Sequence, residues 1–111
     1  MLEPPPPEHE SPSVASLEWR HLPGMRVMRY GGRGCVLSDG RFAVFGGGTD
    51  HIITPTSSCE ALTLDGDIER WDPLPLMHEV RIFFACAAIG VIGECVFVAG
   101  GWNSITAEVF R

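Results

Sequence analysis

The chain has 111 residues, of which 45% are hydrophobic, and a formal net charge of −6 at pH 7. Its eight basic residues are all arginine, so it has no basic surplus to attract a polyanion, and we expect no nucleic-acid partner. No apolar run approaches the ~18 residues that a membrane-spanning helix requires, which argues against a membrane protein.

Residues 1–18 contain the run Pro4 to Pro7 among glutamates and serines, and almost nothing that could be buried. We predict a disordered tail there. The stretch has neither the basic nor the apolar part of a secretory signal, so we expect an intracellular protein, cytoplasmic or nuclear. The cysteines fit no zinc spacing, and we predict four reduced, mostly buried thiols, at Cys35, Cys59, Cys86 and Cys95.

Structure is predicted to begin at Trp19, where residues 18–25 have the pattern of a closing β-strand. From Cys35 two short apolar runs flank the pair Asp39-Gly40, which is a strong signal for a β-hairpin. The polar residues 49–58 that follow are predicted to form a loop.

Two further strands are predicted at 59–65 and 68–75, joined by a tight turn at 65–67, with Pro73 and Pro75 ending the pairing. Strands at 81–90, 95–101 and 107–111 then repeat the order, with a turn near 90–94. No long stretch has apolar residues at helical spacing. We therefore predict an all-β fold of about two four-stranded antiparallel sheets, the second one strand short.

An internal repeat relates the two halves of the chain. Its first part recurs at a fixed offset: Trp19, Leu22, Pro23, Met25 and Arg29 return as Trp71, Leu74, Pro75, Met77 and Arg81. Its second part pairs Val44, Gly46 and Gly47 with Val98, Gly100 and Gly101. A period of roughly 50 residues with a double glycine and a spaced tryptophan is typical of kelch-type propeller blades.

This repeat predicts an incomplete β-propeller, because a closed one needs about four to eight blades. Residues 19–76 would hold the end of one blade and the first repeat, and residues 77–111 a truncated second repeat. The glycine pairs permit sharp turns and close backbone approach. We expect Trp19 and Trp71 to be buried between blades. The repeat arginines, Arg29 and Arg81, are expected to bond to backbone carbonyls or a carboxylate.

Nothing in the sequence predicts an enzyme or a cofactor. The acidic cluster Asp65, Asp67, Glu69 and Asp72 lacks the glycine placement of a calcium loop, and we interpret it as a solvated hairpin turn. Histidines 9, 21, 51 and 78 share no metal-ligand spacing. No motif places a nucleophile beside a base.

The order of double glycine, acidic-led strand, tryptophan, LPxM motif and arginine resembles the kelch-repeat family. The strings RIFFACAA, CVFVAGG and TAEVF, within residues 81–110, are similar to those of plant F-box/kelch-repeat proteins. The resemblance implies the substrate-binding region of a ubiquitin-ligase receptor, which captures a protein for degradation, phenylpropanoid enzymes such as phenylalanine ammonia-lyase among them. The F-box itself has no counterpart in residues 1–18.

A protein partner is expected to contact loops, since loops carry specificity on a rigid frame. The candidate loops are 48–58 and 102–105, with Asp50, His51, Trp102 and Asn103 as candidate contact residues. Open blade edges also favour self-association.

Two other interpretations stay open. In the first, the chain is a non-functional or non-autonomous fragment of a longer kelch protein. In the second, kelch-like blades support a copper oxidase, whose radical site needs tyrosine and histidine ligands and a cross-linked cysteine; the chain has one tyrosine, Tyr30.

Overall fold

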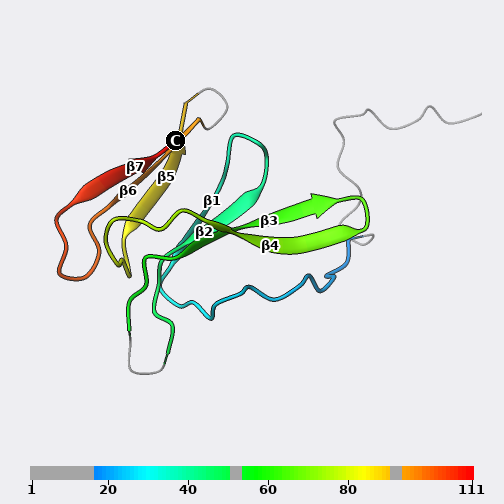
Figure 1. Ribbon diagram of the computed structural model, residues 1–111, viewed down its shortest axis with the longest axis horizontal. Coiled ribbons are helices and arrows are strands. Elements are labelled where there is room, and N and C mark those ends of the chain that lie inside the picture. Colours follow the sequence, from blue (N-terminus) through cyan, green and yellow to red (C-terminus); the bar gives the residue numbers. More distant parts are fainter. Residues whose placement is uncertain (1–16, 51–53, 91–93) are drawn as a thin grey trace, which may run out of the picture.

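The computed structural model describes residues 17–50, 54–90 and 94–111. These residues form strands and connections but no helix, which confirms the all-β prediction (Figure 1). The tail predicted for residues 1–16 lies outside the described part of the chain. The strands are β1 (Arg33–Val36), β2 (Phe42–Phe45), β3 (Cys59–Asp65), β4 (Ile68–Leu74), β5 (Ala85–Ile89), β6 (Cys95–Ala99) and β7 (Ala107–Phe110).

The strands make two antiparallel sheets. The first sheet has the order β1-β2-β3-β4 and the second has the order β5-β6-β7. One apolar core joins them, with side chains of β2 and β3 packed beside those of β6. Its buried members are Leu37, Ala43, Phe45, Cys59, Ala61, Phe84, Val96 and Val98.

The second sheet repeats the first strand by strand and in the same register. Phe45 faces Arg33 on one side and Cys59 on the other. Ala99, its counterpart in the second sheet, faces Ala85 and Ala107 in the same way. The sequence repeat is therefore also a repeat of backbone hydrogen-bond geometry.

The predicted hairpins form where the sequence favours them. Gly40 has a φ of 89° and Gly66 a φ of 61°, the left-handed conformation that glycine adopts without strain. The Asp39 carboxylate accepts a hydrogen bond from the Arg41 backbone N–H at 3.0 Å and steadies its turn. Along β6 the burial alternates from residue to residue, as expected for a strand with one face in the core.

The prediction of a closing strand at 18–25 is wrong for the residues described. Residues 17–25 lie in no strand, and Trp19 is 103% exposed, so its predicted burial is wrong as well. The physical reason is that no sheet formed by the described residues packs against Trp19 to cover its indole. Trp71 is half-buried, with its ring edge against Phe42 and its Nε1 donating to the Pro23 carbonyl at 2.8 Å.

Several strand boundaries differ from those predicted, and two of the differences have a clear physical cause. Pairing of β4 with β3 continues through Pro73 to Leu74. Proline has no N–H, but in an edge strand such as β4 this position can face away from the partner strand, so the pairing loses no hydrogen bond. Strand β5 begins at Ala85 rather than at residue 81, since Phe83 has a φ of 56°, which breaks an extended chain.

The four cysteines are free thiols, but only Cys59 is fully buried. Cys35 in β1 and Cys86 in β5 interact across the two sheets. Burial, followed by the neighbouring Cys35, raises the pKa of Cys86 to about 12. A pKa raised this far keeps the thiol protonated at neutral pH.

We therefore expect the folded chain to resist alkylation at Cys86. A rise of this size lowers the thiolate fraction at pH 8 on the order of a thousandfold, and the thiolate is the reactive form. Peptide mapping after timed iodoacetamide treatment would measure the rate. The same cysteine in urea serves as the control, and equal rates in the two states would contradict the expectation.

Candidate functional site: an arginine clamp and two equivalent loops

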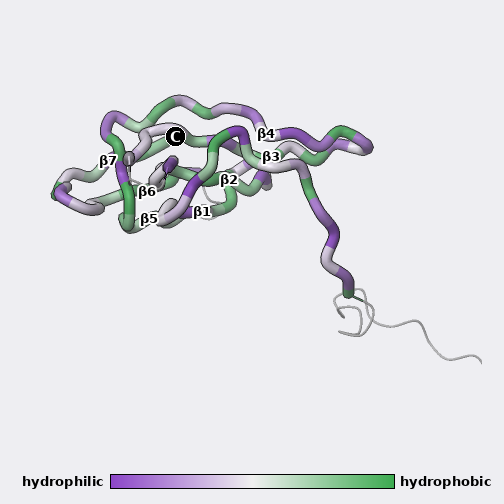
Figure 2. Tube along the Cα trace, turned by 90° about the horizontal axis from the view of Figure 1, so that it is seen from below, coloured by the Kyte–Doolittle hydropathy of each residue, from purple (hydrophilic) through white to green (hydrophobic). Residues whose placement is uncertain are grey.

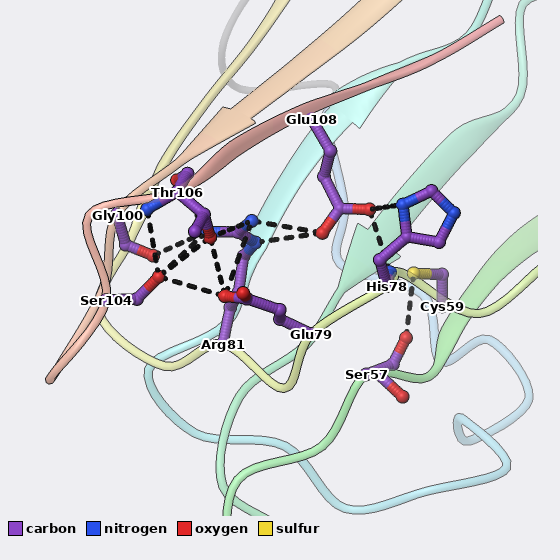
Figure 3. Close-up of polar contacts among 9 residues, drawn as sticks. All are labelled: Ser57, Cys59, His78, Glu79, Arg81, Gly100, Ser104, Thr106 and Glu108. Atoms are coloured by element: carbon purple, nitrogen blue, oxygen red, sulfur yellow. Dashed lines mark hydrogen bonds and ion pairs between the residues drawn. The ribbon is translucent and has the colours of Figure 1, made fainter.

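Arg81 lies in the connection from β4 to β5 and is 2% exposed. Its guanidinium donates to the carbonyls of Gly100 and Thr106, at 2.9 and 3.0 Å. The same group pairs with the Glu108 carboxylate at 3.0 Å (Figure 3). The prediction of carbonyl and carboxylate partners for this arginine is therefore confirmed.

The Glu108 carboxylate is held from two directions. Its Oε2 pairs with Arg81, and its Oε1 accepts the backbone N–H of His78 at 2.8 Å. Burial opposes ionisation of this carboxyl, yet the His78 N–H and the Arg81 guanidinium outweigh burial and lower its pKa. The group therefore stays charged at neutral pH.

Arg29 makes the same set of contacts in the first sheet. It donates to the carbonyls of Gly46 and Ser58 at 3.0 and 2.8 Å and pairs with Glu60 at 2.9 Å. The Arg26 N–H donates to the other Glu60 oxygen at 2.8 Å, as His78 does to Glu108. We call each such set of contacts an arginine clamp.

Each clamp joins the end of the second strand of a sheet to the start of its third strand. Sequence reasoning identified the arginines but assigned no partner to Glu60 and Glu108. The sequence did contain a signal for these partners, because each repeat has an acidic residue near the start of a strand: Glu60 in 59–65 and Glu108 in 107–110. Because the clamps hold both ends of the connecting loops, the loops 48–58 and 102–105 leave the sheets from rigid points.

The first glycine pair lets the second half of the chain approach the first sheet closely. A Cβ on Gly46 would lie 2.6 Å from the Arg81 carbonyl oxygen. The Gly47 N–H donates to that same oxygen at 2.7 Å. Both glycines have positive φ, as Gly100 and Gly101 do in the second sheet. The expected close approach is therefore present at Gly46 and Gly47.

The first candidate loop is organised by Asp50. Its carboxylate accepts hydrogen bonds from the Thr54 backbone N–H at 3.0 Å and from the Thr54 hydroxyl at 2.8 Å. Asp50 is half-buried, so we assign its carboxylate a structural role within the loop. His51, the other candidate contact residue here, lies outside the described residues.

The second candidate loop presents apolar and polar side chains to solvent. Trp102 is 62% exposed and Ile105 is 100% exposed. Asn103 is exposed with a φ of 62°. The Trp102 backbone N–H donates to the Ile82 carbonyl at 3.0 Å, which anchors the loop while its side chains stay accessible.

The two loops occupy equivalent places, since each connects the second and third strands of its sheet. Figure 1 shows the described parts of both loops in the lower half of the view, on the side away from the β1–β2 connection. The structure therefore brings the described parts of the two predicted loops to one side of the molecule.

A scan against protein-family models and a search of the curated proteins find no match to this chain. The internal repeat and its clamps are therefore the main evidence on its architecture.

An apolar groove of ≈ 180 Å³ lies between the sheets, lined by residues that include Phe45, Leu74, Met77 and Phe110. Its acid, Glu108, is already engaged in a clamp. Within the described residues, no three His, Cys, Asp or Glu side chains converge to hold a metal ion, and no helix could cross a membrane. Loop side chains, rather than this groove, are the stronger candidate site.

Proposed function

We propose that this chain is a protein-binding module of the kelch type, which presents the loops 48–58 and 102–105 to a protein partner. The observation that carries the proposal is the arginine clamp, which occurs twice with the same geometry and holds the ends of both loops. In many binding domains a rigid frame provides stability and exposed loops provide recognition.

The exposed side chains support a protein as the partner. Tryptophan is among the residues that most often dominate binding energy at protein interfaces. Trp102 combines high exposure with a backbone anchored to Ile82, so little conformational entropy would be lost on binding. Asn103 beside it supplies polar groups for hydrogen bonds.

A narrower proposal concerns the fate of the partner. The similarity of residues 81–110 to plant F-box/kelch-repeat proteins supports capture of a protein for ubiquitin-dependent degradation. Phenylalanine ammonia-lyase is then the first partner to test. This narrower proposal depends on the resemblance, whereas the binding module depends on the clamps and loops.

Biolayer interferometry with immobilised chain and purified phenylalanine ammonia-lyase tests both the general proposal, protein binding through the loops, and the narrower proposal, this enzyme as the partner. We expect Trp102→Ala to weaken binding by at least about thirtyfold, the size of an interface hot spot. Ile105→Ala is expected to weaken it less. Ile68→Ala, the same change at a residue 49% exposed on the β3–β4 hairpin, is the matched control and should bind as the wild type does.

The outcomes separate the two levels. Absence of binding to this enzyme would contradict the narrower proposal for that target. Binding that is unaffected by Trp102→Ala and Ile105→Ala would contradict the loops as the contact surface. Equal losses in Ile105→Ala and Ile68→Ala would indicate a general effect on the fold.

The fragment interpretation also has an observation in its favour. Several large apolar side chains of the sheets are exposed, among them Val36, Leu64, Ile89 and Phe97. A melt followed by far-UV circular dichroism decides this point. A cooperative β transition supports an autonomous module, and a chain without one would belong to a longer protein.

A further inference from the structure

Strand β7 has an uncovered edge. It pairs with β6 on one side, and no other strand of the described residues pairs with it. Its counterpart β3 lies between β2 and β4. As a result Ala61 in β3 is 0% exposed, whereas Val109, in the equivalent position of β7, is 40% exposed. Within the described residues, the second sheet has no counterpart of β4.

Residues 18–22 carry the side chains of that missing strand. Trp19 and Leu22 are the repeat counterparts of Trp71 and Leu74, which face Leu62 and Cys59 across the β3–β4 ladder. In this chain the 18–22 segment forms no strand, and Figure 2 shows the described start of the chain extending away from the sheets. A strand-like sequence is therefore present without a partner strand.

We infer that the 18–22 segment of one copy adds to β7 of a second copy as its fourth strand. Transferring the register of β4 on β3 places Trp19 opposite Phe110 and Leu22 opposite Ala107. It also places Glu18 opposite Arg111. Opposite charges at directly facing positions of an antiparallel pair stabilise it, so the side chains favour this register.

A second observation supports the same contact. In the first sheet, the space in front of Gly46 is filled by the segment that follows β4, including Arg81 and Phe84. In the second sheet, a Cβ on Gly100 would meet only the Ser104 carbonyl oxygen, at 3.7 Å. Residues 23–32, the repeat counterparts of 75–84, directly follow the 18–22 segment. One continuous stretch of a second copy, residues 18–32, would therefore cover both the open edge of β7 and the open space in front of Gly100.

The occupant is a second copy because the segment of the same copy lies far from β7. Figures 1 and 2 both place the described start of the chain on the side of the β3–β4 hairpin, at the opposite end of the molecule from β7. Arg20 pairs with Glu69 at 2.7 Å, and Pro23 accepts the Trp71 Nε1–H, so residues 20–23 are held near β4. Head-to-tail contacts close into rings when the rotation between copies closes, and the blade-to-blade rotation of a propeller is of this kind. With two blades in each copy, a propeller of four to eight blades requires about two to four copies.

Size-exclusion chromatography with light scattering over a dilution series tests the inference on the 12.1 kDa chain. We expect a discrete oligomer for the wild type and association at least about thirtyfold weaker for Trp19→Ala. Because Trp19 is 103% exposed, its loss should not unfold the single copy. Ile68→Ala, at a residue 49% exposed on the β3–β4 hairpin, is the control and should assemble as the wild type does. A monomeric wild type, or equal assembly of the two variants, would overturn the inference.

A mixing experiment tests the head-to-tail arrangement itself. Pro73, which has no N–H, lies opposite Glu60, so the β3–β4 bonds come from flanking positions such as Ala61. Val109→Pro, at the equivalent position of β7, removes the N–H that would donate to the added strand and should yield monomers. Mixed with Trp19→Ala, it should form a one-to-one dimer, because each variant retains what the other lacks.

Circular dichroism of each variant alone shows whether it is folded. If Val109→Pro is unfolded, Arg111→Glu replaces it, since this change places like charges opposite Glu18 at an exposed position. A mixture of folded variants that stays monomeric would overturn the head-to-tail arrangement.

Discussion

Arg81→Ala is expected to lower the free energy of unfolding by about 3–5 kcal/mol, because it removes a buried guanidinium and leaves a partly buried carboxylate and two carbonyls without their donor. Glu108 would lose the guanidinium, and the carbonyls of Gly100 and Thr106 would lose their donor. Since small domains are stable by only about 5–15 kcal/mol, a loss of this size approaches complete unfolding. Arg81→Lys should restore little of the lost stability, because an ammonium group cannot reproduce the planar arrangement of N–H donors of a guanidinium.

Urea denaturation followed by circular dichroism measures this effect. The Trp19→Ala background is preferable, since association would otherwise add to the apparent stability. Arg70→Ala is the control, because the Arg70 side chain is 57% exposed and pairs with Asp72 at the surface, where ion pairs contribute about 0–1 kcal/mol. Similar losses for the two substitutions would contradict the structural importance of the clamp.

Gly46→Ala is expected to destabilise the chain by roughly 3 kcal/mol or more, because two effects add. The φ of 62° costs a residue with a Cβ about 1–2 kcal/mol. The new Cβ would also lie 2.6 Å from the Arg81 carbonyl oxygen, a backbone atom that can move only if the two sheets separate.

Gly66→Ala shows the first effect alone, so the difference between it and Gly46→Ala measures the second. Gly66 has a φ of 61°, nearly that of Gly46, yet a Cβ there would meet nothing within 4 Å. We therefore expect a loss of only about 1–2 kcal/mol for Gly66→Ala in the same urea experiment. If both alanine variants were equally stable, close packing of the sheets at Gly46 would not contribute to stability.

Local signals in the sequence were sufficient for most strands. The hairpins at 36–42 and 65–68 follow from Gly40 and Gly66, which adopt a backbone conformation that few other residues tolerate. Short apolar runs beside turn signals predicted β2 and β6, and in the structure each has one face in the core. These features depend on residues that are close together in the chain, and such local patterns can be identified directly in a sequence.

Pairing partners required the tertiary structure. Arg81 and Glu108 are 27 residues apart, and the pairing of β5 with β6 and of β6 with β7 brings their side chains together. Burial of Trp19 was predicted from its resemblance to Trp71, but burial depends on a neighbouring sheet that this copy does not place there.

The sequence by itself determined the all-β class, the turns and the repeat, because backbone preference and periodicity are properties of short segments. Only the tertiary structure decided which carboxylate each arginine holds, where the loops emerge and which strand edge is open. Those features depend on contacts between segments distant in the chain, and their free energy comes from burial and pairing that no short segment contains.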